Sequence, residues 1–152
     1  MRISNLVSQI IEPGCFIVYF TRTAHIFIVE SVADQAEEAL LKFRLGIERS
    51  NDAVFMTDPD GIIIYANPGF ERIYGFSADE ALGKTPRILK SGVLSQETYQ
   101  DFWQTLLDKQ VVAGEIVNKH KDGRLLTIEG SNNPILDETG NIVGFLAIHR
   151  DI

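Results

Sequence analysis

The side chains that could carry out covalent or metal chemistry are few in this sequence, and their spacing matches no catalytic arrangement. Cys15 is the single cysteine, so no internal disulfide or multi-cysteine metal site can form. The chain contains no Gly-x-x-x-x-Gly-Lys-Ser/Thr phosphate loop and no His-Glu-x-x-His zinc motif. Two acidic pairs fall in segments that are typical of turns, where capping and solubility explain them: Asp58 with Asp60, and Asp137 with Glu138. We therefore expect that the chain itself is not an enzyme.

Length and composition are those of an ordinary globular domain. The chain has 152 residues, of which 45% are hydrophobic and 23% charged, and its mean hydropathy is +0.02. These values predict one domain with a short appended segment. The net charge is −7, from 14 basic and 21 acidic residues, whereas a duplex-binding surface needs clustered Lys and Arg, so we expect no nucleic-acid partner. The lone cysteine favours a reducing compartment, and we expect a cytoplasmic protein.

Residues 1–33 differ from the rest of the chain. They hold two basic and two acidic residues, so the net charge lies entirely in residues 34–152. The apolar stretch 16–32 is shorter than the about 20 residues of a spanning helix and is interrupted by Arg22 and His25, so we expect no membrane insertion. Its β-branched and aromatic residues predict two short strands, at 16–20 and 25–29. We interpret 1–33 as an extension that packs on the domain or on a second copy of the chain; an unnatural upstream remnant is the alternative.

The pattern after residue 33 predicts a helix and then strands. Asp34 and Glu37 form a capping box, and an apolar stripe predicts an amphipathic helix to about residue 48: Ala36, Leu40, Phe43 and Ile47. Strand-like segments follow at 53–58 and 62–67, joined by the hairpin sequence Asp58-Pro59-Asp60-Gly61. Three more strands are expected at 111–120, 124–133 and 141–150, with tight-turn sequences between them.

Short helices are expected between the second and third strands. Their starts are marked by capping sequences at Asn67-Pro68, Ser77 and Ser95, and the last of them has a stripe of apolar residues that includes Trp103. No parallel crossover is needed, so the sequence predicts an α+β fold with a five-stranded antiparallel sheet and the short helices on one face. The last strand is apolar at both alternations, which indicates that its outer face is also covered, by the first helix or by a partner.

Several short segments, in this order and spacing, resemble a PAS domain over residues 34–152. They are Ala53-Val54-Phe55-Met56-Thr57-Asp58, Ala66-Asn67-Pro68-Gly69-Phe70, Tyr74-Gly75-Phe76, Lys119-His120-Lys121-Asp122-Gly123, Asn133-Pro134-Ile135 and His149-Arg150-Asp151-Ile152. PAS domains are sensory and dimerisation modules. The resemblance implies a homodimer through the outer sheet face and the N-terminal segment. It also implies an output domain in the same protein beyond residue 152, such as a histidine kinase of a two-component system or a diguanylate cyclase.

The resemblance also bears on cofactors. Blue-light members attach flavin to a cysteine in the short helix, and the matching stretch here, Gly83-Lys84-Thr85-Pro86, has Pro86 at that position. A covalent cysteinyl-flavin is therefore excluded. Haem needs an axial ligand, most often histidine. The helix expected at 95–109 contains none, and His120 is expected in solvent on a hairpin, so we do not expect haem.

The stretch Arg87-Ile88-Leu89-Lys90-Ser91-Gly92 resembles the FAD-binding PAS domains of redox sensors such as nitrogen-fixation regulators. By this resemblance Trp103, Asn118 and His149 line the isoalloxazine ring, next to Ile88 and Leu89. Trp103 would supply a flat apolar wall and Asn118 an amide for the imide edge, and His149 could donate to a reduced, anionic flavin. The sequence departs from that pattern at Pro86, at Leu126 and at Val111-Val112-Ala113.

The same residues have simpler interpretations. Trp103 on a helical stripe fits an ordinary core position, Asn118 fits a strand end, and His149 fits a hydrogen-bonded core or interface histidine. Two functions therefore remain open. The first is a sensory module that relays ligand or redox state through the central sheet and a dimer interface to an output domain. The second is a ligand-free dimerisation and signal-relay module.

Overall fold

The computed structural model describes the backbone of residues 22–152 and the side chains of residues 31–152. The chain divides into two compact units, residues 1–42 and residues 43–152. Helix α1 spans Arg22–Glu48 and shares residues with both units. In the described part of the chain, no helix combines the length and the apolar character needed to cross a bilayer.

The strand predicted at 25–29 is wrong, because these residues are helical in α1. The helix also runs through Asp34, so the predicted capping box does not start it. β-branched residues lower helix propensity only by tenths of a kcal/mol, and lengthening an existing helix adds hydrogen bonds without a new nucleation cost. The continuation of the helix therefore outweighs the local preference for strand. The other predicted strand, at 16–20, lies outside the described residues.

The five-stranded antiparallel sheet is confirmed. Its strands are β1 Ala53–Thr57, β2 Ile63–Ala66, β3 Val112–Lys119, β4 Leu125–Leu136 and β5 Ile142–Asp151. They are ordered β2-β1-β5-β4-β3, and every neighbouring pair is antiparallel. Strands β1 and β5 are the first and last strands in the sequence, and they pair with each other inside the sheet. Ala53 of β1 lies opposite His149 of β5.

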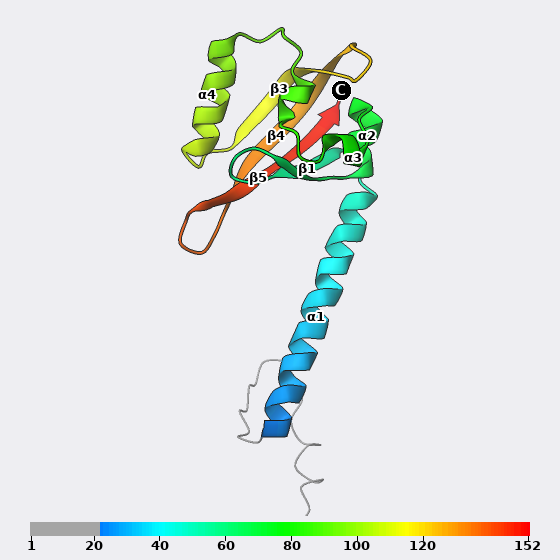
Figure 1. Cartoon of the computed structure of the whole chain (residues 1–152), viewed down its shortest axis with the longest axis vertical. Helices are drawn as coiled ribbons and strands as arrows, with labels where there is room; N and C mark the ends of the chain where they lie inside the picture. Colours follow the sequence, from blue (N-terminus) through cyan, green and yellow to red (C-terminus); the bar gives the residue numbers. More distant parts are fainter. Residues whose placement is uncertain (1–21) are drawn as a thin grey trace, which may run out of the picture. The chain divides into compact units, whose positions relative to one another are not determined.

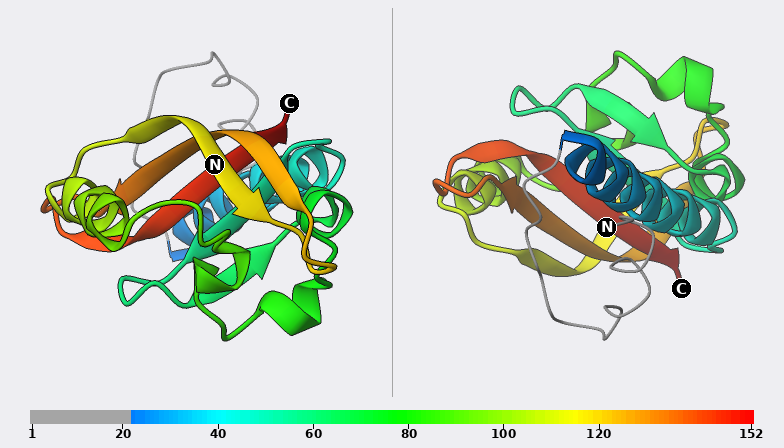
Figure 2. Two further views of the ribbon diagram at one scale, coloured as in Figure 1. Left: turned by 90° about the horizontal axis from the view of Figure 1, so that it is seen from above. Right: turned by 90° about the horizontal axis from the view of Figure 1, so that it is seen from below.

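The short helices lie on one face of the sheet, as predicted. Helices α2 (Pro68–Tyr74) and α3 (Ala78–Ala81) contact β1 and β2, whereas α4 (Gln96–Leu107) contacts β3 and β4 (Figures 1 and 2). The 3-10 helix η2 (Pro86–Leu89) lies between them in sequence and contacts β3. The three predicted cap residues, Asn67, Ser77 and Ser95, each accept a hydrogen bond from a backbone N–H of their helix.

Side chains alternate between the two faces of the sheet. The inner face carries Phe55 of β1, Ala147 of β5 and Ile128 of β4, which are buried with Phe70 and other residues of the core under the short helices. On the outer face, β5 presents Leu146 and Ile148, and Ile148 is 38% exposed. The outer face of β5 is therefore apolar and incompletely covered by the described residues.

Asn67 joins the root of α1 to the sheet and to α2. Its side-chain oxygen accepts hydrogen bonds from the backbone N–H groups of Val54 (2.8 Å) and Phe70 (2.9 Å). Its amide nitrogen donates to the carbonyl oxygens of Ile47 (2.9 Å) and Asp52 (3.0 Å). Because Asn67 is fully buried, these four bonds satisfy it completely and fix the start of β1 next to α2.

Candidate functional site

A cavity of about 1130 Å³ lies between the inner face of the sheet and the layer formed by η2 and α4. Four of the five residues predicted for the site line it: Leu89, Trp103, Asn118 and His149. Ile88 is not among its lining residues and packs against the hydrophobic core instead. The fold therefore brings residues from one 3-10 helix, one helix and two strands around a single cavity.

Trp103 has a double role in this arrangement. Its ring meets Phe145 of β5 edge to face, with ring centroids 5.7 Å apart. It also covers Gly61 of the β1–β2 turn, where a Cβ atom would lie 3.2 Å from the indole. Trp103 therefore docks α4 against two parts of the sheet and also supplies an aromatic part of the cavity wall.

A chain of buried polar side chains crosses the inner face of the sheet. The amide nitrogen of Asn118 donates to the Tyr74 hydroxyl (2.8 Å), and that hydroxyl lies 2.6 Å from Nδ1 of His149. The other ring nitrogen, Nε2 of His149, lies 3.2 Å from the side-chain oxygen of Asn132. All four residues are buried. The chain links α2, β3, β4 and β5 by three consecutive hydrogen bonds.

Burial keeps both titratable members of this chain neutral. It lowers the pKa of His149 from 6.5 to about 4, because an imidazolium would lose its hydration there. It also raises the pKa of the Tyr74 hydroxyl, although the hydrogen bond from Asn118 acts in the opposite direction. At neutral pH these four hydrogen-bonded side chains therefore hold one hydroxyl proton and one imidazole proton, and together they carry no net charge.

The surroundings of His149 change the interpretation of its role. The ring meets Phe55 edge to face at 5.1 Å and lies against Gly130, where a Cβ atom would be 3.2 Å from it. Both ring nitrogens already have protein partners, Tyr74 and Asn132. A ligand that took a hydrogen bond from His149 would have to displace one of them, so direct donation to a reduced flavin does not fit this geometry.

The η2 segment closes one side of the cavity and is tied to β3. Lys90, directly after η2, forms an isolated backbone bridge with Asn118. The Lys90 ammonium lies 4.3 Å from the centroid of the Tyr99 ring of α4, a cation–π contact that links η2 to α4. The Tyr99 hydroxyl is buried and has no hydrogen-bond partner within residues 22–152. It is a polar group left free beside a cavity that Tyr99 lines.

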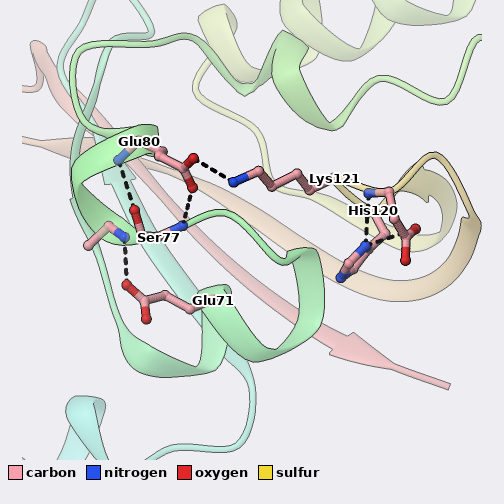
Figure 3. Close-up of polar contacts among 7 residues, drawn as sticks. Glu71, Ser77, Glu80, His120 and Lys121 are labelled. Carbon is pink, nitrogen blue, oxygen red and sulfur yellow. Dashed lines mark hydrogen bonds and ion pairs between the residues drawn. The ribbon is translucent and has the colours of Figure 1, made fainter.

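Glu80 of α3 and Lys121 of the β3–β4 hairpin are in contact beside the end of α2 (Figure 3). Lys121 of the hairpin forms an ion pair with Glu80, and its hydrogen bond lowers the pKa of that carboxyl. Glu80 also completes a capping box with Ser77. The backbone N–H of Lys121 donates to the carbonyl oxygen of Tyr74 (2.8 Å). The hairpin therefore fixes the last residue of α2, which carries the central hydroxyl of the polar chain.

His120 is less exposed than the sequence predicts. Its side chain is only 15% exposed and pairs with Asp122. The ring lies against Gly75, where a Cβ atom would be 2.5 Å from two ring atoms. A glycine after α2 thus makes room for the ring, and the residue that we expected in solvent instead seals the junction of α2 and the hairpin.

Sequence reasoning missed two members of the polar chain, Tyr74 and Asn132. Asn132 could have been found, because it stands on the inward alternation of β4 together with Leu126, Ile128 and Gly130, where a polar residue requires a partner. Tyr74 carried no such signal. It ends a short amphipathic helix, and its contact with Asn118 joins residues 44 positions apart.

The fold combines a five-stranded antiparallel sheet with a cavity under short helices. In the described residues, no group of three or more His, Cys, Asp or Glu side chains is placed to hold a metal ion. The chain belongs to the PAS family, because the family model described as the PAS fold matches residues 41–152. The family match thus begins inside α1, later than the predicted boundary after residue 33.

Similar proteins are larger regulators. The chain is 39% identical over 106 residues to the nitrogen fixation regulatory protein of Klebsiella oxytoca, which covers 70% of this chain and 21% of that protein. It is 32% identical over 120 residues to hybrid signal transduction histidine kinase L of Dictyostelium discoideum, covering 79% of this chain and 7% of that protein. The crystal structure of a PAS domain from Colwellia psychrerythraea superposes with a TM-score of 0.67 at 33% identity, covering 74% of this chain and 97% of that one.

The chain therefore spans about a fifth of the Klebsiella protein and a smaller share of the Dictyostelium one. It is a PAS sensory module of the kind that occurs within regulators and signal-transduction kinases.

Proposed function

We propose that the cavity binds a flavin, FAD, without a covalent bond, and that the module reports the state of this cofactor. The observation that carries the proposal is a pair of amide groups. The side-chain oxygen of Asn118 and the side-chain nitrogen of Asn132 belong to buried residues that line the cavity, and neither has a side-chain partner within residues 31–152. Among residues 31–152 the buried polar side-chain atoms without a partner are the Tyr65 and Tyr99 hydroxyls, so these two amide atoms are accessible and can bond a polar ligand in the cavity.

The remaining walls suit a large planar ring system. The cavity volume of about 1130 Å³ is slightly larger than the about 300–1,000 Å³ of most small-molecule sites. Trp103 and Leu89 supply apolar surface, and the free hydroxyl of Tyr99 adds a polar group at the side. A bound flavin would supply a redox centre. The chain's own residues would bind and orient it, and Pro86 leaves it non-covalent. The resemblance to FAD-binding PAS domains supports the same cofactor.

The route by which the module would signal starts at the sheet. Asn118, Asn132 and His149 lie on three adjacent strands, so a change in the ligand's hydrogen bonds would act on the sheet directly. His149 is followed by Arg150, whose guanidinium forms two hydrogen bonds of 3.1 Å with the Asp52 carboxylate before β1. We propose that the contact between Arg150 and Asp52 relays the state of the cavity to an output domain in the same protein. This domain would be a histidine kinase or a diguanylate cyclase in the cytoplasm.

The test is FAD binding with matched variants. The purified protein is incubated with FAD, passed through a desalting column and assayed for retained flavin. We expect Asn118→Leu to lose most of the retained flavin and His149→Ala to lose part of it. Asn133→Leu serves as the control, because Asn133 is on the outer face and does not line the cavity. Equal retention in Asn118→Leu and Asn133→Leu would remove the proposed site.

A ligand-free dimerisation module is the second candidate, and exposed apolar side chains favour it. Ile148 on the outer face is 38% exposed, and Leu40 and Phe43 of α1 are 70% and 72% exposed. Such residues are covered when a second copy of the chain binds. We expect Ile148→Glu to shift a dimer towards monomer in light scattering, whereas Thr127→Glu, on the polar part of the same face, should not. A wild-type protein that is monomeric at high concentration would contradict this candidate.

A further inference from the structure

The two free amide groups of the cavity stand at opposite ends of the buried polar chain. Asn118 of β3 is its first member and Asn132 of β4 its last, with Tyr74 and His149 between them. Each inner member makes two hydrogen bonds within the chain. The chain is therefore continuous, and no member can change its donor or acceptor role alone without breaking a buried hydrogen bond.

The roles in the polar chain follow from its two ends. The Asn118 amide nitrogen can only donate, so the Tyr74 oxygen accepts from it. The Asn132 side-chain oxygen can only accept, so Nε2 of the neutral imidazole carries the proton and donates it, Nδ1 accepts, and the Tyr74 hydroxyl donates to Nδ1. The Asn118 oxygen and the Asn132 nitrogen are then the groups that remain for a ligand.

We propose that Tyr74 is a positioning residue of the cavity: its hydroxyl fixes an acceptor at Asn118 and a donor at Asn132, and thereby sets the hydrogen-bond pattern that a ligand must match. The site then takes a neutral heterocycle that donates a proton at one end of the chain and accepts one at the other. The inference rests on the proposed function only in that a ligand occupies the cavity.

The surroundings of Tyr74 suit a fixed role. Its ring is fully buried and packs on Phe70 with centroids 5.1 Å apart. Its carbonyl oxygen accepts from Lys121, and the next residue, Gly75, ends α2 in the left-handed conformation with φ 78°. The packing of the ring on Phe70 and the hydrogen bond to the backbone carbonyl of Tyr74 together fix the position of the hydroxyl. It cannot reach other partners unless α2 moves.

The first test measures the protonation of His149 directly and needs no ligand. Nitrogen-15 NMR of the histidine rings, with the His149 signals assigned from a His149→Gln variant, should show the proton on Nε2. Tyr74→Phe keeps the ring but removes the donor to Nδ1, so we expect a mixture of tautomers. Tyr65→Phe is the matched control, because the Tyr65 hydroxyl is buried and has no partner in the described chain. A wild-type proton on Nδ1, which can be read even if Tyr74→Phe does not fold, would overturn the inference.

The second test measures FAD affinity in the same variants. We expect Tyr74→Phe to weaken binding about tenfold, as for one misplaced hydrogen bond, and Tyr65→Phe to leave it unchanged. In an Asn118→Leu background the Tyr74→Phe effect should largely vanish, because Tyr74 acts through the amides. Wild-type binding of FAD with an unaltered affinity and tautomer in Tyr74→Phe would refute the positioning role. A wild type that binds no FAD would refute the proposed cofactor, and the tautomer would still decide the role of Tyr74.

Discussion

The neutral, buried state of His149 makes the stability of the domain depend on pH in a defined window. The folded protein holds the pKa of this ring at about 4, against an ordinary value of 6.5. As the pH falls below 6.5, the unfolded chain therefore takes up a proton that the folded chain does not. The free energy of unfolding should fall with pH from about 6.5 down to about 4 and be fully recovered above this range.

The size of the effect follows from the two pKa values. The interval between 6.5 and about 4 corresponds to about 3 kcal/mol at 1.36 kcal/mol per pKa unit. Between pH 7.5 and pH 5 the loss should be about 2 kcal/mol. The carboxyls with lowered pKa values, Glu80, Asp122 and Asp137, lose their contribution at lower pH. Above pH 5, the change in the free energy of unfolding with pH is therefore expected to come mainly from His149.

Urea denaturation at several pH values between 5 and 7.5 measures this effect. The fluorescence of Trp103, the single tryptophan, reports unfolding because its ring packs on Phe145 and Gly61. His149→Gln retains a hydrogen-bonding side chain that does not titrate, so its stability should change by much less over the same range. His25 and His120 are present in both proteins, so the comparison isolates His149. Identical pH dependence in the wild type and in His149→Gln would show that His149 is not the source of the effect.

Three further predictions concern the start of α2 and the end of α1. Asn67→Ala should lower the free energy of unfolding by about 3 kcal/mol, because it leaves several buried backbone groups unpaired and removes the cap of α2; urea denaturation checks this, and a loss below about 1 kcal/mol would contradict it. Gly69→Ala should cost about 2–3 kcal/mol, because its Cβ would lie 2.1 Å from the carbonyl oxygen of Asp52. Gly46→Ala, in α1 with open space around it, should instead raise helix stability by about 0.5–1 kcal/mol, and thermal melts of the two variants should shift in opposite directions.

Much of the fold could be predicted from local signals. The hairpin at Gly61, the caps at Asn67, Ser77 and Ser95, and the alternating strands place the five strands and the starts of α2, α3 and α4 within a few residues of their observed positions. These signals are local because caps and turns depend on residues within one helical turn. The error at 25–29 has the opposite cause: a local strand preference was overridden by helix α1, which begins at Arg22 and continues to Glu48.

The site was predictable only in part. Resemblance places Leu89, Trp103, Asn118 and His149, which line one cavity. Leu89 is buried in the core and also lines the cavity, whereas Ile88, one position earlier in the 3-10 helix, packs against the same core without reaching the cavity. The hydroxyl of Tyr74 could not be assigned from sequence, because its partners come from strands 44 and 75 positions away.

The most direct test of the account is the absorption spectrum of the freshly purified protein, followed by acid release and identification of any coloured compound. We expect a flavin spectrum and the release of intact FAD, because residues 34–152 contain no cysteine that could hold the flavin covalently. A fully folded protein that is colourless and stays colourless after incubation with FAD would contradict it. The function of the module would then rest on the outer face of β5 and on a dimer.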